Sequence, residues 1–220
     1  MLYKIKLKIF KILQNMLKFF NLKIYYSKDE NFLSNSKVSK IIDVGVAKGT
    51  NFLTSNFPKA YYFLVEANQG YYKYLEEVYL KKFEGKLFKV AAGKENTSKL
   101  FYDSGPISSF YNRENFNFKK KINVNILPLD QILLNEKISN DTILKIDSEG
   151  GELDILKGAI QTLDKVNYVI IELRLQKINT YNPSEVINFL FQKNFFWKKI
   201  LKVYFAKKGI DYIDILFEKR

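Results

Sequence analysis

From about residue 40 onward, short runs rich in β-branched and aromatic residues alternate with segments of helical periodicity. This alternation constrains the fold more than any other feature, because consecutive parallel strands need long crossovers, usually helical, between them. The sequence therefore predicts an α/β fold with a mostly parallel sheet. The runs typical of strands span residues 40–44, 61–66, 86–92, 142–147 and 167–173.

Helical patterns follow several of these runs. The C-terminal one has the best start signals, with Asn182 as the cap, Pro183 in the first turn and Glu185 at the third position. We expect helices at residues 68–82, 151–163 and 183–192.

Two regions of the chain depart from this simple alternation. Near the C-terminus, residues 198–206 and 211–218 have the pattern of a closing antiparallel pair of strands. Residues 93–141 are long for a crossover and contain turn residues and aromatics without a clear period. Long connections of this kind are typical of functional or disordered loops.

The composition restricts the chemistry that the chain can perform. Its 220 residues, 47% of them hydrophobic, can bury the core of one domain. There are no cysteines and no histidines, which excludes disulfides, thiolate nucleophiles, imidazole bases and the common zinc sites. Acid–base chemistry must therefore fall to Asp, Glu, Lys or Tyr.

The formal net charge of +13 is concentrated at the front of the chain, where residues 1–40 hold nine lysines against Asp29 and Glu30. Residues 2–22 combine these lysines with apolar residues at helix-like spacing. We expect residues 1–39 to be a basic amphipathic extension, which either lies on an anionic membrane or docks on the sheet, and residues 40–220 to be the main domain. Nucleic acid is a weaker explanation of the charge, because no recognised motif accompanies it.

The apolar runs of the N-terminal segment are interrupted by Lys4, Lys6 and Lys8. No run approaches the roughly 20 apolar residues needed to span a bilayer, and the start of the chain lacks the features of a secretory signal. The sequence thus predicts a cytoplasmic protein with possible peripheral contact at the inner face of the membrane.

The stretch "IIDVGVAKGT" at residues 41–50 places a sharp turn directly after a predicted strand. A dinucleotide-binding fingerprint would have glycines at positions 45, 47 and 50, but the chain has Ala47 and Thr50 at the last two. The spacing of Asp43, Gly45 and Gly49 instead fits folds that bind S-adenosylmethionine, where no pyrophosphate must be accommodated. These glycines let the backbone approach a ligand beyond the strand ends.

Glu66 ends the second predicted strand, 21 residues after Gly45. A carboxylate at this place can accept hydrogen bonds from both hydroxyls of a ribose. The alternative is that Asp43 caps a turn and that Glu66 is an exposed strand end. The combined spacing within an α/β pattern favours a nucleoside site over this purely structural interpretation.

Several motifs occur together in an order that resembles one known family. They are "IIDVGVAKGT", "FLVEAN", a polar-aromatic loop with "SSF", "LPLDQIL", "LKIDSEGGELDILKGA" and "YVIIEL". Over residues 40–175 the chain is similar to the FkbM-like family of S-adenosylmethionine-dependent methyltransferases. The family pattern usually has Gly-Ala-Asn where this chain has Gly45, Val46 and Ala47.

This resemblance implies a Rossmann-like methyltransferase fold: a mostly parallel seven-stranded sheet with helices on both faces and an antiparallel last strand. It implies S-adenosylmethionine as the cofactor and O-methylation, often of a sugar hydroxyl in a surface glycan, glycolipid precursor or secondary metabolite. The cofactor contacts that it implies are Asp43, Gly45, Gly49, Glu66 and Asn68.

An acidic cluster, "KIDSEGGELD", follows the fourth predicted strand, where the reactive methyl group should face the acceptor. A carboxylate there can orient the acceptor hydroxyl and take its proton. We expect Asp147 to be the base and Glu149 the second catalytic group, with Glu172 lining the same pocket. Glu152 and Asp154 fit the acidic first turn of a helix.

Other roles for these residues stay open. Asp147, Glu149 and Glu172 could instead hold a divalent cation through oxygen ligands. Ser109, with its neighbour Ser108 in the irregular loop, could contact the cofactor or the acceptor. Lys145 and Lys157 could bind an anionic substrate, but their patterns favour an ordinary strand-edge lysine and a helix-surface lysine.

Two other functions compete with methyl transfer. A nicotinamide-dependent oxidoreductase is disfavoured by Ala47 and Thr50. A non-catalytic protein of the same fold, acting as a scaffold at the membrane, would have the cofactor site without turnover.

Overall fold

The computed structural model describes residues 33, 37–105, 108–110, 120–175, 180–206 and 209–220. The chain divides into two compact units, residues 1–36 and residues 37–220. The expected N-terminal extension falls almost entirely outside the described residues. Among those that are described, no helix is long and apolar enough to cross a membrane.

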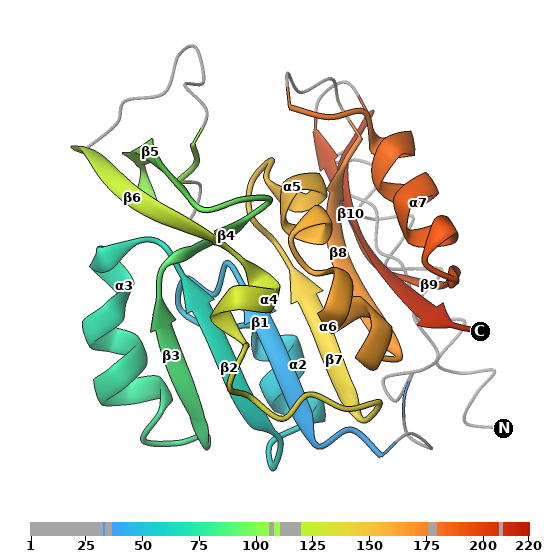
Figure 1. Cartoon of the computed structure of the whole chain (residues 1–220), viewed down its shortest axis with the longest axis horizontal. Helices are drawn as coiled ribbons and strands as arrows, with labels where there is room; N and C mark the ends of the chain where they lie inside the picture. Colours follow the sequence, from blue (N-terminus) through green and yellow to red (C-terminus); the bar gives the residue numbers. More distant parts are fainter. Residues whose placement is uncertain (1–32, 34–36, 106–107, 111–119, 176–179, 207–208) are drawn as a thin grey trace, which may run out of the picture. The chain divides into compact units, whose positions relative to one another are not determined.

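A seven-stranded sheet forms the centre of the second unit, in the order β3-β2-β1-β7-β8-β10-β9 (Figure 1). Neighbouring strands are parallel except at β10, which is antiparallel to both β8 and β9. The predicted parallel sheet with an antiparallel last strand is confirmed. Its strands are β1 (Lys40–Val44), β2 (Tyr61–Glu66), β3 (Gly85–Lys89), β7 (Thr142–Ile146), β8 (Tyr168–Arg174), β9 (Phe195–Ala206) and β10 (Gly209–Lys219).

Helices cover both faces of this sheet because successive side chains of each strand point to opposite faces. Ile42 of β1 belongs to the same apolar cluster as Leu156 of α5 and Leu163 of α6, and α5, α6 and α7 lie in front of the sheet in Figure 1, with α2 behind. Tyr62 of β2 points to the other face, where its ring meets that of Tyr79 edge-on. The helices are α2 (Asn51–Asn56), α3 (Gln69–Tyr74), the π-helical η1 (Leu75–Tyr79), α4 (Leu129–Ile132), α5 (Glu152–Lys157), α6 (Ile160–Lys165) and α7 (Pro183–Gln192).

The predicted start of α7 is confirmed in detail. The side chain of Asn182 accepts a hydrogen bond from the Ser184 backbone N–H, and the carboxylate of Glu185 accepts one from the Asn182 N–H. This reciprocal cap satisfies donors that the first turn of a helix leaves without partners.

The helix expected at residues 151–163 is instead two helices, α5 and α6. They separate at Gly158, where an added β-carbon would lie 2.0 Å from the carbonyl oxygen of Gly93. The carboxylate of Asp130 caps the second helix by accepting hydrogen bonds from the backbone N–H groups of Gln161 and Thr162. Both contacts join residues far apart in the sequence, so helical periodicity could not show the break.

The interpretation of residues 93–141 as an irregular loop is wrong for two stretches of it. This region supplies β5 (Thr97–Asp103) and β6 (Lys120–Pro128), which form a second sheet with β4 (Ala91–Gly93) in the order β4-β6-β5. The run expected as one strand at 86–92 therefore belongs to two sheets. Phe101, Val124 and Ile126 form a small core beneath them, which explains the aromatic and β-branched residues of this stretch.

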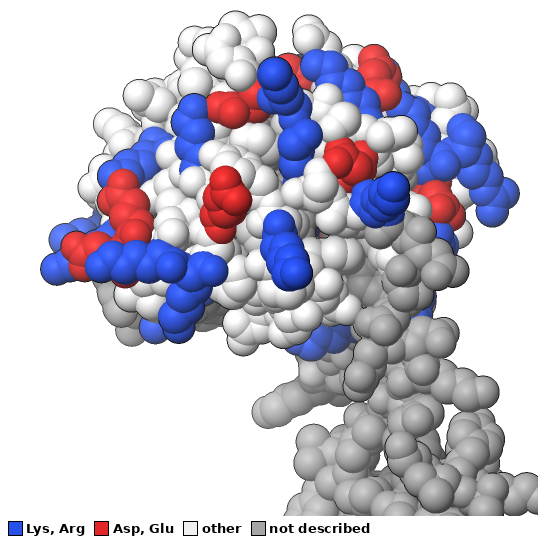
Figure 2. Space-filling model, turned by 90° about the horizontal axis from the view of Figure 1, so that it is seen from below, with Lys and Arg blue, Asp and Glu red and all other residues white. Residues whose placement is uncertain are grey.

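Charged side chains are mixed on the face that Figure 2 draws. Lysine and arginine are spread across the domain with acidic side chains between them. On that face the described domain therefore shows interspersed charges rather than one basic field.

Candidate active site

A cavity of about 570 Å³ opens at the carboxyl ends of β1, β2, β7 and β8. This volume lies within the roughly 300–1,000 Å³ of ordinary small-molecule sites. In sheet order β2 lies on one side of β1 and β7 on the other, so the cavity occupies the switch point where open α/β sheets bind ligands. Of the predicted site residues, the cavity is lined by Gly45, Gly49, Glu66, Asn68, Asp147, Glu149 and Glu172, but not by Asp43 or Ser109.

The turn after β1 needs glycine at its first position for two reasons. Gly45 has a φ of 79°, a left-handed conformation that side chains disfavour. A β-carbon here would lie 1.7 Å from the carbonyl oxygen of Asp147. Position 45 therefore requires glycine, because the turns that follow β1 and β7 approach each other closely there.

Gly49 is also needed for packing. Its φ is 97°, and a β-carbon would lie 2.3 Å from a ring atom of Tyr79. The sequence spacing indicated a place where backbone approaches a ligand. The structure shows that glycine at position 49 leaves room for the ring of Tyr79. The backbone of Gly49 also lines the cavity.

The carboxylate of Glu66 holds this turn in place. Its Oε2 accepts a hydrogen bond from the Ala47 N–H at 2.7 Å, and its Oε1 accepts one from the Asn68 N–H at 2.7 Å. Burial raises the pKa of Glu66, and these two hydrogen bonds oppose the rise. Each oxygen keeps acceptor capacity, so the same group can also bind hydroxyls of a ligand in the cavity.

Asn68 connects this turn to the second sheet. Its side-chain amide donates hydrogen bonds to Asp103 Oδ1 at 2.9 Å and to Ser108 Oγ at 3.2 Å. Ser108 lines the cavity. Ser109 is buried, and its hydroxyl donates to the carbonyl oxygen of Glu149 at 3.1 Å, which ties the loop to the acidic turn.

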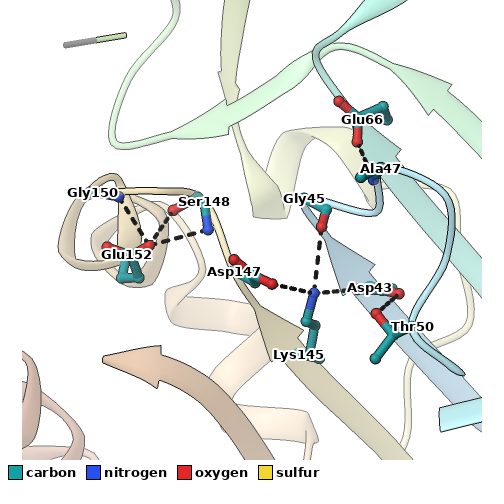
Figure 3. Close-up of polar contacts among 10 residues, drawn as sticks. All are labelled: Asp43, Gly45, Ala47, Thr50, Glu66, Lys145, Asp147, Ser148, Gly150 and Glu152. Atoms are coloured by element: carbon teal, nitrogen blue, oxygen red, sulfur yellow. Dashed lines mark hydrogen bonds and ion pairs between the residues drawn. The ribbon is translucent and has the colours of Figure 1, made fainter. Parts of the chain in front are cut away.

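Lys145 lies at the centre of a buried polar network (Figure 3). Its ammonium is 3.1 Å from Asp43 Oδ1 and 3.3 Å from Asp147 Oδ2, and it donates to the Gly45 carbonyl oxygen at 3.3 Å. The other oxygen of Asp43 accepts a hydrogen bond from the Thr50 hydroxyl at 2.8 Å. The network joins β1 to β7 below the cavity, so Asp43 supports the site from beneath.

The expectation that Lys145 is a strand-edge lysine is wrong, because β7 is central and the Lys145 residue is only 7% exposed. Burial alone would lower the pKa of Lys145, but the carboxylates of Asp147 and Asp43 outweigh it and raise that pKa. Burial likewise raises the pKa of Asp43, against the opposing effects of Lys145 and Thr50. The pairing of Lys145 with Asp43 depends on the position of β1 beside β7, which the sequence of β7 alone does not show.

Three carboxylates converge at the open side of the network. Single oxygen atoms of Asp147, Glu149 and Glu172 all lie within 4.8 Å of one another. Glu149, with a φ of 54°, forms an ion pair with Arg174 at 2.8 Å, and Asp147 has its pair with Lys145. The spacing suits a hydroxyl group held by several acceptors, and it would also suit a divalent cation.

Glu152 belongs to the turn itself. One of its oxygens accepts hydrogen bonds from the backbone N–H groups of Ser148 and Gly150 and from the Ser148 hydroxyl (Figure 3). Glu152 is 2% exposed and does not line the cavity. It therefore shapes the loop that carries Asp147 and Glu149, in agreement with its predicted structural role.

Comparison with known families decides the class of this site. The profile described as "Methyltransferase FkbM domain" matches residues 43–196, which contain the turn, Glu66, the Lys145 network and the carboxylates. The chain belongs to the FkbM methyltransferase family. It is thus an S-adenosylmethionine-dependent methyltransferase, and the expected enzyme class and cofactor are confirmed.

Solved methyltransferase structures are similar to this chain, and one of them reaches a TM-score of 0.50. Magnesium protoporphyrin IX methyltransferase from Synechocystis PCC 6803, with bound S-adenosylmethionine, has a TM-score of 0.50 at 7% identity, over 85% of this chain and 73% of that one. Precorrin-6y C5,15-methyltransferase from Geobacter metallireducens GS-15 has a TM-score of 0.46 at 12% identity, over 87% and 84%. None of the curated proteins gives a significant sequence match.

The methyltransferase cavity also contains residues that the sequence analysis missed. The strands β9 and β10 contribute Lys202, Tyr204, Tyr212 and Asp214 to its wall. The sequence predicted the antiparallel pair of strands that carries these residues. It did not show the register of that pair or its place beside β8, and so it did not show that these side chains line the cavity.

We predict that Glu66→Ala weakens binding of S-adenosylhomocysteine by about 1–3 kcal/mol, because ribose hydroxyls and two backbone donors lose their acceptor. Calorimetric titration measures the dissociation constant. The exposed Glu77 provides a control, Glu77→Ala, which should bind as the wild type does. An unchanged dissociation constant in folded Glu66→Ala would remove this residue from the cofactor site.

We predict that Lys145→Met lowers the free energy of unfolding by about 3–5 kcal/mol, because it leaves Asp43 buried without a cation. The pKa of Asp43 then rises further, so the variant is least impaired at acidic pH. The variant loses stability progressively as the pH rises from the pKa of Asp43 in the unfolded state to the pKa of Asp43 in the folded state. Urea unfolding across this range measures the effect.

Two further variants make this experiment specific. Lys157→Met removes an exposed helix lysine and should change little, whereas adding Asp43→Asn to Lys145→Met should reduce the pH dependence. Equal effects of Lys145→Met and Lys157→Met would contradict the network.

Proposed function

We propose that this methyltransferase transfers the methyl group to oxygen, on a sugar hydroxyl of a glycan or glycolipid precursor. The observation that carries the proposal is the convergence of Asp147, Glu149 and Glu172 within 4.8 Å at the cavity. An alcohol is a weak acid, so methyl transfer to its oxygen benefits from a nearby group that accepts the hydroxyl proton. Histidine is absent from the sequence, and these carboxylates supply that capacity.

The two sides of the cavity have different chemistry. On the side of β1 and β2, the glycine turn, Glu66 and Asn68 present backbone and hydrogen-bond acceptors suited to a nucleoside. On the side of β7 and β8, the lining includes the carboxylates of Asp147, Glu149 and Glu172 together with Lys145 and Ile170. We assign the first side to the cofactor and the second to the acceptor hydroxyl.

S-adenosylmethionine supplies a methyl group on a positively charged sulfur. The protein must hold the acceptor oxygen in line with the carbon–sulfur bond, which lowers the entropic barrier. As the oxygen–carbon bond forms and the carbon–sulfur bond breaks, Asp147 accepts the hydroxyl proton. Glu149, held by Arg174 at 2.8 Å, orients the same hydroxyl.

The ion pair with Lys145 gives Asp147 a fixed position. The ammonium contacts Asp147 Oδ2 at 3.3 Å and also bonds to the Gly45 carbonyl oxygen at 3.3 Å. The proton acceptor and the cofactor turn are thereby held by one group. Such positioning matters because small misplacements of reacting groups are costly to the rate.

A sugar acceptor fits this site because its hydroxyl groups can donate to several carboxylates at once. The resemblance to the FkbM-like family implied the same substrate class. Residues 1–22, with lysines spaced among apolar residues, would bring the enzyme to an anionic membrane where lipid-linked precursors lie.

We predict that Asp147→Asn lowers the initial methyl-transfer rate at saturating S-adenosylmethionine by about 10²- to 10⁴-fold, the usual contribution of general-base catalysis. The size of the side chain is kept, so the fold and most cofactor affinity should remain. Release of S-adenosylhomocysteine with a sugar that the wild-type enzyme methylates gives the rate. Full activity of the variant would exclude Asp147 as the base.

Glu149→Gln is the matched comparison, with a smaller loss expected for an orienting group. Comparable losses in both variants that added magnesium or manganese restores would favour a metal site at the same carboxylates. A wild-type enzyme that binds the cofactor but methylates no acceptor sugar would favour a non-catalytic role.

We predict that deleting residues 1–22 reduces binding to anionic vesicles while leaving affinity for S-adenosylhomocysteine unchanged. Each lysine near such a surface contributes about 1 kcal/mol, so the wild-type interaction should also weaken with salt. Vesicle sedimentation measures the bound fraction, with neutral vesicles as the control. Aggregation or loss of cofactor binding by the truncated protein would instead make this segment part of the folded domain.

A further inference from the structure

The acceptor side of the cavity extends past the proposed catalytic carboxylates onto the closing strands. Four cavity-lining residues of these strands, Lys202, Tyr204, Tyr212 and Asp214, form this extension. Together with Glu172 of β8, which is opposite Asp214, we call them the β9–β10 wall. None of them lies on the cofactor side.

Strand pairing explains why these side chains meet. Asp214 of β10 is opposite Glu172 of β8 and opposite Lys202 of β9. Two residues away along β10, Tyr212 is opposite Tyr204 of β9. Directly opposed residues on adjacent strands point to the same face, so the wall consists of a polar row beside an aromatic row.

The aromatic row gives the wall an apolar surface. The rings of Tyr204 and Tyr212 are stacked, with centroids 3.9 Å apart and an interplanar angle of 28°. Cations border them, since the Lys202 ammonium lies 3.9 Å from the Tyr204 centroid and the Arg174 guanidinium 5.4 Å from that of Tyr212. Rings held in this way form a rigid wall against which the C–H groups of a sugar can pack.

The polar row offers hydrogen-bonding groups without protein partners. Within the described part of the chain, the carboxyls of Glu172 and Asp214 neither accept a hydrogen bond nor form an ion pair at normal distance. Asp147 and Glu149, by contrast, have Lys145 and Arg174. Half-buried carboxyl groups without partners favour a ligand that brings donors to them.

Acidic side chains outnumber basic ones at this end of the cavity, where Asp147, Glu149, Glu172 and Asp214 line it beside Lys145 and Lys202. Burial raises the pKa of Glu172 from its ordinary 4.5 to about 9, and the carboxylates of Asp147, Asp214 and Glu149 add to the rise, against Lys145 alone. The carboxyl groups of Glu172 and Asp214 can form hydrogen bonds with the hydroxyl groups of a sugar. An anionic group on a ligand would meet the same three carboxylates.

We propose that the β9–β10 wall binds a sugar ring of the acceptor that is uncharged or carries an amino group, and that it disfavours rings bearing a carboxylate or phosphate. The proposal rests on the proposed sugar O-methyltransferase function and adds a place and a charge preference for the acceptor. Tyr204 and Tyr212 bind the C–H surface, and Glu172 and Asp214 bind hydroxyl or amino groups.

The test uses the full-length protein saturated with S-adenosylhomocysteine and saturation-transfer NMR. The probes are methyl glycosides of neutral hexoses, 6-deoxyhexoses and hexosamines, each compared with its uronic acid or 6-phosphate counterpart where one exists. We expect saturable binding of a neutral or amino glycoside, with the anionic counterpart at least about tenfold weaker, because like charges repel in a partly desolvated site.

Variants assign that binding to the wall. Tyr204→Ala and Tyr212→Ala should weaken it about five- to tenfold without changing affinity for S-adenosylhomocysteine. The control is Trp197→Ala, which removes an exposed aromatic side chain of β9, the strand of Tyr204. Trp197 does not line the cavity, so this variant should bind glycosides as the wild type does. Asp214→Asn should narrow the gap between neutral and anionic glycosides.

The outcomes separate this proposal from the one on which it rests. If no glycoside of any class binds, both the sugar acceptor and the wall are rejected. If glycosides bind but the anionic ones bind as tightly, or if the tyrosine variants bind them unchanged, only the wall is rejected. Should an alanine variant fail to fold, the charge comparison in wild-type protein and Asp214→Asn still decides.

Discussion

The buried ammonium of Lys145 is the interaction on which the rest of the site depends. It compensates two carboxylates, Asp43 at 3.1 Å and Asp147 at 3.3 Å, and bonds to the carbonyl oxygen of Gly45. Buried charges are costly unless paired and hydrogen-bonded, so these groups require one another. The same bonds hold the cofactor turn after β1 against the acidic turn after β7, and thereby fix the distance between the two halves of the cavity.

A second constraint is the concentration of acidic groups in a small, partly desolvated space. The protein satisfies them in different ways. Glu66 accepts two backbone hydrogen bonds at 2.7 Å, Glu152 binds the turn that follows β7, and Glu149 pairs with Arg174. Glu172 is left with a raised pKa. Perturbed carboxyls of this kind gather at functional sites, which is why this cavity is the candidate active site.

The closing strands form one wall of the cavity. The opposite wall is built from short turns after the parallel strands β1 and β2. The wall formed by the closing strands depends on the position of β10 between β8 and β9, because that pairing brings Tyr204 and Tyr212 to the cavity. Function resides in such local sites and not in the fold itself.

The sequence by itself determined the α/β class, the parallel sheet with its closing antiparallel pair, and the turn carrying Gly45 and Gly49, because periodicity and local backbone requirements are written in neighbouring residues. It did not show the second sheet, the break at Gly158 or the burial of Lys145. Each of these depends on contacts between residues far apart in the chain, such as Gly158 with Gly93 and Lys145 with Asp43. Only the tertiary structure decided which charges are paired and which line the cavity.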